Sequence, residues 1–245
     1  MQGRVILPDP VIRLAHRLVH ALRPLIEEAG AIRPGTRTAA GFGSFGAASL
    51  INHPVASLFG ARNIHIGTHT LIGRGCTLTT GYGPDDPQTP DRALVVGDRC
   101  IIGAGAVITA HESIEIGDDV WFGNQVFVSD AGHGYQDVET PIGRQLGSHA
   151  PVSIGAGSWI GHGAIILPGT RVGSHVVVGA GSVVRGVVPD HSVVAGVPAR
   201  VVRRLEPSVG WVATRNAADV RPAWTAAQAD AMLSEEPAGE VAQHG

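Results

Sequence analysis

The chain has 245 residues, 44% of them hydrophobic, and a formal net charge of −3. That hydrophobic content argues against a disordered chain, and the charge gives no electrostatic case for nucleic-acid binding. No apolar run approaches the ~18 residues that a transmembrane segment needs, and no export signal is evident, so we expect a cytoplasmic protein. The 34 glycines lack the period of collagen, and all 18 basic residues are arginine.

Residues 1–37 are predicted to form an amphipathic helix and a linker. Over residues 9–29, apolar side chains recur every three or four positions, with a kink at Pro24. The opposite helix face carries basic side chains: Arg13, Arg17, His20 and Arg23. We expect the helix to pack on the rest of the protein; a helix lying on a membrane surface is the alternative.

A six-residue repeat dominates residues 38–204. Within each hexad an aliphatic residue is followed by a small one, and a second small residue comes four positions after the aliphatic one. We interpret each hexad as a short strand and a turn, with three hexads to a coil and parallel strands about 4.8 Å apart in stacked coils. The glycine after the aliphatic residue is expected to supply a turn conformation that a side chain opposes. Residues 38–60 are expected to form irregular strands that cap the first coil.

Sorting the aliphatic residues by their place in the coil gives three faces. The first holds Ile66, Val96, Ile116, Ile154 and Val172. The second holds Ile72, Ile102, Phe122, Ile160 and Val178. The third holds Leu78, Ile108, Val128, Ile166 and Val184. Cys76 and Cys100 occupy small-residue positions, which predicts buried packing roles rather than reactive thiols.

The repeat over about residues 64–200 resembles that of the hexapeptide-repeat acyltransferases, [LIV]-G-x-x-[STAV]-x. The resemblance implies an all-β fold, a left-handed parallel β-helix, here with an N-terminal helix and a short C-terminal helical extension. It also implies a homotrimer with active sites between subunits. Residues 205–245 lie beyond the repeat and are expected to be partly flexible, with one helix over residues 225–234.

Every interruption of the repeat follows the third face. The longest are the stretches 81–94 and 130–151, and two extra residues follow Ile108. Insertions at equivalent places in stacked coils meet at one edge, and loops clustered on a rigid scaffold commonly carry function. This edge holds His111 and His133 on adjacent coils and is the predicted site.

The segment that begins Asp130-x-x-His133-Gly134-Tyr135 and continues through Thr140-Pro141-Ile142 to Gln145 resembles the catalytic loop of the polysaccharide-modifying branch of the family. The resemblance implies that His133 takes the proton of an acceptor hydroxyl, which suits an imidazole near pH 7. His111 and Asp130 are further catalytic candidates. The residues predicted to bind the substrate are Tyr82, Asp85, Glu112, Tyr135 and Glu139.

The later coils resemble the family's coenzyme A channel, in which backbone groups and small residues line the wall and cations bind the phosphates. Where the family often has a lysine, this chain has Arg185, which can contact phosphate through its planar guanidinium. The candidate cofactor-binding residues are Trp159, Gly161, Ala180, Arg185, Arg200 and Arg203.

The resemblance therefore implies a coenzyme A-dependent O-acyltransferase, with acetyl-CoA or another short acyl-CoA as co-substrate and no metal. The acceptor is predicted to be a hydroxyl of a sugar, polysaccharide or glycolipid precursor. Two alternatives stay open. One is a zinc enzyme like the γ-type carbonic anhydrases, although the histidine pair that such a site needs is not found on the predicted edge. The other is a non-catalytic β-helix scaffold.

Overall fold

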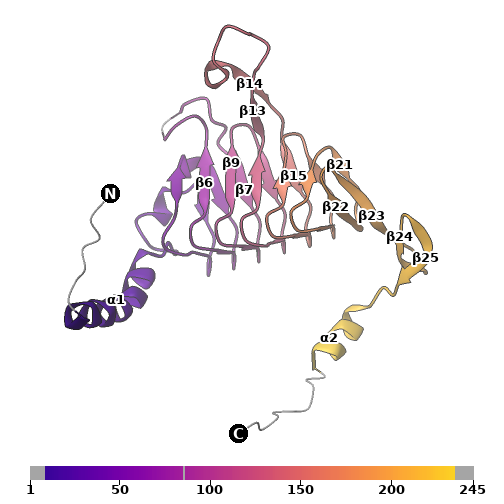
Figure 1. Cartoon of the computed structure of the whole chain (residues 1–245), viewed down its shortest axis with the longest axis horizontal. Coiled ribbons are helices and arrows are strands. Elements are labelled where there is room, and N and C mark those ends of the chain that lie inside the picture. The colour runs from indigo at the N-terminus through magenta and orange to yellow at the C-terminus, as the bar shows by residue number, and fades with distance from the viewer. Residues whose placement is uncertain (1–8, 85, 235–245) are drawn as a thin grey trace. The chain divides into compact units, whose positions relative to one another are not determined.

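The computed structural model describes residues 9–84 and 86–234, and its centre is a coil of stacked parallel strands (Figure 1). The first sheet contains β1 (Ser44–Phe45), β4 (Ile64–Ile66), β7 (Leu94–Val96), β10 (Ile114–Ile116), β15 (Val152–Ile154), β18 (Arg171–Val172) and β21 (Val187–Val188). The second contains β2 (Leu50–Ile51), β5 (Leu71–Ile72), β8 (Ile101–Ile102), β11 (Trp121–Phe122), β16 (Trp159–Ile160), β19 (Val177–Val178) and β22 (Ser192–Gly196). The third contains β3 (Ser57–Phe59), β6 (Thr77–Thr80), β9 (Val107–Ala110), β12 (Phe127–Ser129), β17 (Ile165–Ile166) and β20 (Val183–Val184).

The predicted stacking of the three faces is confirmed. Ile66 pairs with Val96, and Val96 pairs with Ile116, so equivalent hexad positions lie in register along the first sheet. The aliphatic side chains of all three faces point inward and are at most 3% exposed. Cys76 and Cys100 are fully buried among them and are not disulfide-bonded, as predicted.

The coil begins earlier than predicted. Residues 44–59 were expected to be irregular, but β1, β2 and β3 pair in parallel register with β4, β5 and β6. They form a complete first coil, in which Ile51 is fully buried. The sequence did not predict this coil because the spacing of its aliphatic residues departs from six. Three short 3₁₀ helices, Ala39–Gly41, Ala61–Asn63 and Ile142–Arg144, complete the connections.

The role predicted for the glycine after each aliphatic residue is wrong. Gly103 does not have the positive φ expected of it; instead, a Cβ added there would lie 2.3 Å from the carbonyl oxygen of Gly123 in the next coil. Positive φ angles occur two residues later, at Gly105 and at the non-glycine residues Arg99 and Gln125. The motif glycine is therefore needed because stacked backbones approach closely, and not because the turn itself requires it.

Helix α1 (Asp9–Gly30) forms where the sequence predicted a helix, but the prediction that it packs on the protein is wrong, since none of its 22 described residues is buried. In the described part of the chain, no helix is long and apolar enough to cross a bilayer.

The contacts divide the chain into two units between Val201 and Val202. The second unit contains strands that the sequence did not predict. Strand β23 (Ala199–Glu206), which crosses the boundary, pairs antiparallel with β24 (Gly210–Ala213), and β24 pairs antiparallel with β25 (Asn216–Arg221). Helix α2 (Ala226–Ser234) follows. Residues 235–245, for which a loose end was predicted, lie outside the described residues.

Candidate functional site

Three loops that leave the third sheet meet at one edge of the coil, as the spacing of the insertions predicted. One loop follows β6, the second follows β9, and the third follows β12 and forms a hairpin of β13 (Ala131–His133) and β14 (Leu146–His149) (Figure 1). Each loop contributes one aromatic or imidazole ring to a cluster of Tyr82, His111 and His149. The ring centroids of Tyr82 and His111 are 4.8 Å apart, and those of His111 and His149 are 5.2 Å apart.

A hydrogen bond of 2.7 Å joins the Tyr82 hydroxyl to Nε2 of His149. This bond ties the loop after β6 to the hairpin, although the two residues are 67 positions apart in the sequence. His149 was not among the predicted site residues. The signal that could have located it is its place at the end of the insertion, where antiparallel pairing brings it opposite Ala131.

Asp130 lies beneath this cluster and is completely buried. Its carboxylate accepts hydrogen bonds of 2.8–3.0 Å from the backbone N–H groups of His111, Glu112 and Ser113. It therefore fixes the loop that carries His111. Among the described contacts, Asp130 makes no hydrogen bond to His133, so its geometry is that of a residue that positions the loop.

His133 lines a cavity of about 170 Å³ together with Tyr82 and His111. The cavity is completed by Ser129, Ala131, Gly132, Leu146 and Gly147. Two imidazoles and a phenol therefore face one small space, and His133 is the more exposed imidazole of the two. Such a space can receive a hydroxyl group and offers a proton acceptor for it.

The two family models that match the chain correspond to its repeats. "Bacterial transferase hexapeptide (six repeats)" matches residues 151–186, and "Hexapeptide repeat of succinyl-transferase" matches residues 93–129. WbbJ of Escherichia coli, named as a lipopolysaccharide biosynthesis O-acetyl transferase, is 41% identical over 141 residues, which are 54% of this chain and 71% of WbbJ. The chain belongs to the hexapeptide-repeat transferases.

Other relatives of this hexapeptide-repeat transferase are matched over part of their length. A protein of Mycobacterium tuberculosis named as an acetyltransferase is 38% identical over 62% of this chain, but the match spans only 47% of that protein. Among solved structures, AntD of Bacillus cereus, an N-acyltransferase crystallised with dTDP and coenzyme A, has a TM-score of 0.60 at 22% identity. That match covers 73% of this chain and 92% of AntD, and it shows a shared fold.

In this hexapeptide-repeat transferase, burial lowers the pKa of His111, and the nearby His149 lowers it further, while Asp130 acts in the opposite direction. Nδ1 of His111 is buried and lies 3.6 Å from Oδ1 of Asp130, too far for a hydrogen bond. The folded protein therefore favours the neutral imidazole.

We expect His111 to make stability depend on pH. Because its pKa is lowered on folding, the unfolded chain gains a proton first as the pH falls below the usual histidine value of about 6.5, and stability is lost from there down to the folded pKa. Urea unfolding of the wild type and His111→Gln between about pH 5.5 and 8 measures this. The wild type should lose more stability than the variant toward low pH, and parallel curves would contradict the expectation.

Three of the other residues predicted to bind substrate, Tyr135, Glu112 and Glu139, do not line the cavity. Tyr135 is 75% exposed on the hairpin. Glu112 and Glu139 are also exposed, and neither lines the cavity. Asp85 lies outside the described residues. Among the described members of the predicted substrate-binding set, only Tyr82 lines the cavity with His111 and His133.

The predicted cofactor residues are spread over the later coils and beyond them. Trp159 is 54% exposed on the outer surface of the second sheet, directly beside Trp121. A Cβ on Gly161 would lie 2.6 Å from the backbone nitrogen of Ala180, so these two small residues are adjacent. Arg185 is exposed and forms no ion pair within the described residues.

The two other arginines predicted to bind the cofactor have partners. Arg200 is exposed, and its guanidinium donates a 2.9 Å hydrogen bond to the carbonyl of Ala199. Arg203 departs further from the expectation, because it forms an ion pair with Asp219 and also donates to the carbonyl of Trp211. These bonds connect β23 to the antiparallel strands that the sequence did not predict, so Arg203 would have to break them to bind a phosphate.

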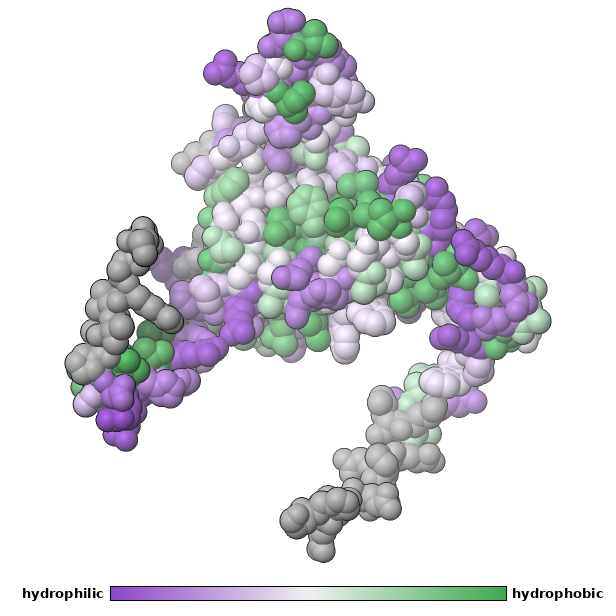
Figure 2. Space-filling view, viewed as in Figure 1, coloured by the Kyte–Doolittle hydropathy of each residue, from purple (hydrophilic) through white to green (hydrophobic). Residues whose placement is uncertain are grey.

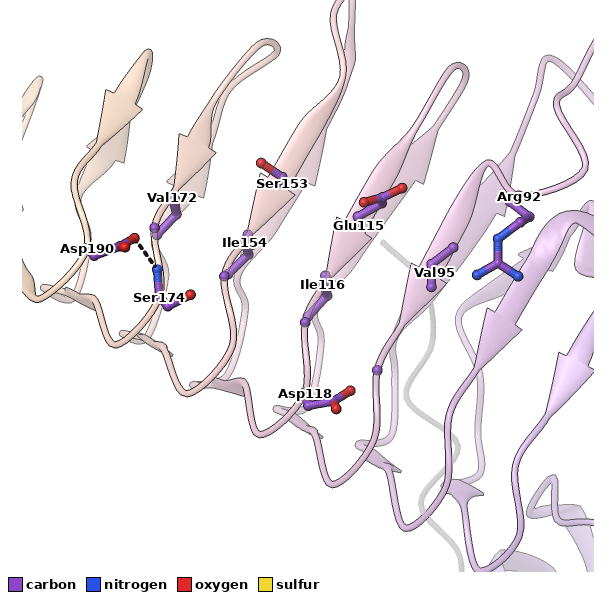
Figure 3. A pocket seen from close by; sticks show the side chains of 14 residues that line it. Arg92, Val95, Glu115, Ile116, Asp118, Ser153, Ile154, Val172, Ser174 and Asp190 are labelled. Carbon is purple, nitrogen blue, oxygen red and sulfur yellow. Dashed lines mark hydrogen bonds between the residues drawn. The ribbon is translucent and has the colours of Figure 1, made fainter.

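A larger hollow of about 520 Å³ runs along the first sheet (Figure 3). It shares no lining residue with the histidine cavity. Two of its carboxylates cap turns, since Asp190 accepts a hydrogen bond from the backbone N–H of Ser174 and Asp118 accepts one from that of Asp98. These carboxylates have structural partners. Across residues 9–84 and 86–234, no group of three or more His, Cys, Asp or Glu residues is arranged to hold a metal ion.

Proposed function

We propose that this chain is a coenzyme A-dependent O-acyltransferase that transfers a short acyl group, most simply acetyl, to a hydroxyl of a sugar, polysaccharide or glycolipid precursor. The observation that carries the proposal is the convergence of His133, His111 and Tyr82 on one cavity at the edge of a hexapeptide coil. It is supported by relatives named for O-acetyl transfer, including WbbJ and the galactoside O-acetyltransferase of Lactococcus lactis, which is 29% identical over 68% of this chain.

His133 is proposed to act as the general base. It accepts the proton of the acceptor hydroxyl while that oxygen attacks the thioester carbonyl carbon. The new C–O bond forms, the C–S bond then breaks, and coenzyme A leaves as the thiol after taking up a proton. Neutral imidazole is suited to this transfer near pH 7, and no acyl-enzyme is needed.

The acyl-CoA donor is proposed to lie along the later coils, against the small residues Gly161 and Ala180. Arg185 is the cation best placed in this proposal to meet a phosphate, because its guanidinium is exposed and has no ion-pair partner within the described chain. We further infer a left-handed coil, as the family resemblance implies.

Self-association as a homotrimer is also proposed. The outer surface of the second sheet carries a ladder of apolar side chains: Leu71, Ile101, Trp121 and Trp159 are paired in register and 37–54% exposed. A second copy of the chain would remove such a surface from water.

The test is thiol release from acetyl-CoA in the presence of a panel of sugars, with longer acyl-CoA donors in parallel. We expect release that depends on the acceptor, and mass spectrometry of the product should show an ester at a hydroxyl. An amide product would overturn O-transfer. Failure of acyl-CoA to bind in calorimetry would favour a scaffold, and stoichiometric zinc in the purified protein would favour the zinc enzyme.

A further inference from the structure

Helix α1 exposes an unusually complete apolar face. Val11, Leu18 and Leu25 are spaced by seven residues and lie within about 40° of one another around the helix axis. Eight large apolar side chains of the helix are 47–65% exposed: Val11, Ile12, Leu14, Leu18, Val19, Leu22, Leu25 and Ile26. At about 1.5 Å per residue, 22 residues give this face a length of about 33 Å. A soluble helix ordinarily buries such a face against a core.

The opposite face of α1 is basic over most of its length. From residue 10 to residue 24 the sequence contains three arginines, two histidines and no acidic residue. Arg13 and Arg17 make no ion pair within the described chain, whereas Arg23 near the end of the helix is bonded to Glu27 at 2.7 Å. The acidic residues are confined to the helix ends, so a single sign of charge flanks the apolar face.

We propose that α1 docks the protein on an anionic lipid surface. The helix would lie in the plane of the interface, with its leucine, isoleucine and valine side chains among the acyl chains and Arg13 and Arg17 at the lipid phosphates. Figure 2 shows hydrophobic and hydrophilic residues side by side on the helix surface. This inference goes beyond the proposed acyl transfer and does not depend on it.

Charge complementarity favours a lipid surface over a second copy of the same helix. Two copies joined through their apolar faces would leave Arg13 and Arg17 on the outer surfaces of the pair, with acidic residues available only at the helix ends. An anionic bilayer instead offers phosphates along the whole length of the helix. Each arginine near such a surface strengthens binding about fivefold.

Co-sedimentation of the full chain with vesicles tests the proposal. The probes are vesicles of phosphatidylcholine alone and of phosphatidylcholine mixed with phosphatidylglycerol in equal parts. We expect binding to the anionic vesicles only. Arg13→Gln/Arg17→Gln should weaken it about 25-fold, and Leu18→Ser/Leu22→Ser should weaken it at least about tenfold. The matched controls are Arg215→Gln and Val138→Ser, which change exposed residues outside the helix. Both control variants should bind the anionic vesicles as the wild type does.

Because none of the substituted helix residues is buried, the variants should keep the coil, and circular dichroism verifies this. Equal binding by the wild type and the helix variants would overturn the proposal, as would no binding to anionic vesicles. A molecular mass that falls on Leu18→Ser/Leu22→Ser, without vesicle binding by the wild type, would assign the face to a second copy. The vesicle experiment contains no acyl donor. A negative binding result is therefore distinguishable from failure of the proposed acyl transfer.

Discussion

Replacing His133 with alanine is expected to lower kcat for acyl transfer by about 10²–10⁴-fold. The alanine side chain cannot accept the proton of the acceptor hydroxyl, so the oxygen must attack the thioester without a base. Since the His133 side chain is exposed at the cavity and its imidazole makes no hydrogen bond in the described structure, the loss should come from chemistry and not from unfolding. Thiol release under saturating donor measures the effect.

A second histidine provides the control for this substitution. His175 is exposed at a turn of the coil with a φ of 52°, a conformation that asparagine tolerates. The His175→Asn variant should retain wild-type kcat. If His133→Ala also retained it, the assignment of the base would be wrong; if both variants lost activity equally, the loss would reflect a general disturbance of the coil.

The repeat could be predicted from sequence because each hexad position has a single environment. An aliphatic residue such as Ile116 has a paired neighbour in the coil on either side, Val96 and Ile154, so the pattern also specifies the register. The edge that carries the site followed from the same rule, since insertions at equivalent positions must emerge together. His111 and His133 were located in this way.

The features that could not be predicted from sequence depend on tertiary contacts that do not follow the repeat. The bond between Tyr82 and His149 joins two irregular loops, and no local pattern specifies it. Asp130 was predicted as a catalytic candidate, but its buried carboxylate accepts hydrogen bonds from backbone N–H groups of a neighbouring coil. Strand β24 was missed because it has only four residues, and β25 was missed because its six residues, which include two alanines and two charged residues, are all exposed and lack the alternation of a half-buried sheet.

Asp130 is the second residue whose replacement should have a large effect. Its side chain is 0% exposed and accepts hydrogen bonds from three consecutive backbone N–H groups. Truncation to alanine leaves these donors without a partner at the base of the loop that carries His111. Because a buried donor without an acceptor loses the free energy of its interaction with water, we expect Asp130→Ala to lower the free energy of unfolding by about 3 kcal/mol.

The same substitution is expected to lower kcat by about 10–100-fold while His133 is still present. Release of the loop lets His111 move relative to the cavity. Small misplacements of groups around a reacting centre lower the reaction rate strongly. Asp130→Asn retains one acceptor oxygen, so it should recover part of both losses. Urea unfolding and thiol release at a temperature where the variants remain fully folded separate the two effects.

Asp118→Asn is the matched control, because Asp118 also accepts a backbone hydrogen bond at a coil turn, from the N–H of Asp98, but its side chain is 51% exposed. Water can replace that acceptor, so its stability should change by less than about 0.5 kcal/mol and its kcat should be unaffected. A kcat for folded Asp130→Ala equal to that of the wild type would show that Asp130 supports the coil alone. A loss of kcat that asparagine partly restores would show that the carboxylate holds the His111 loop in its working position.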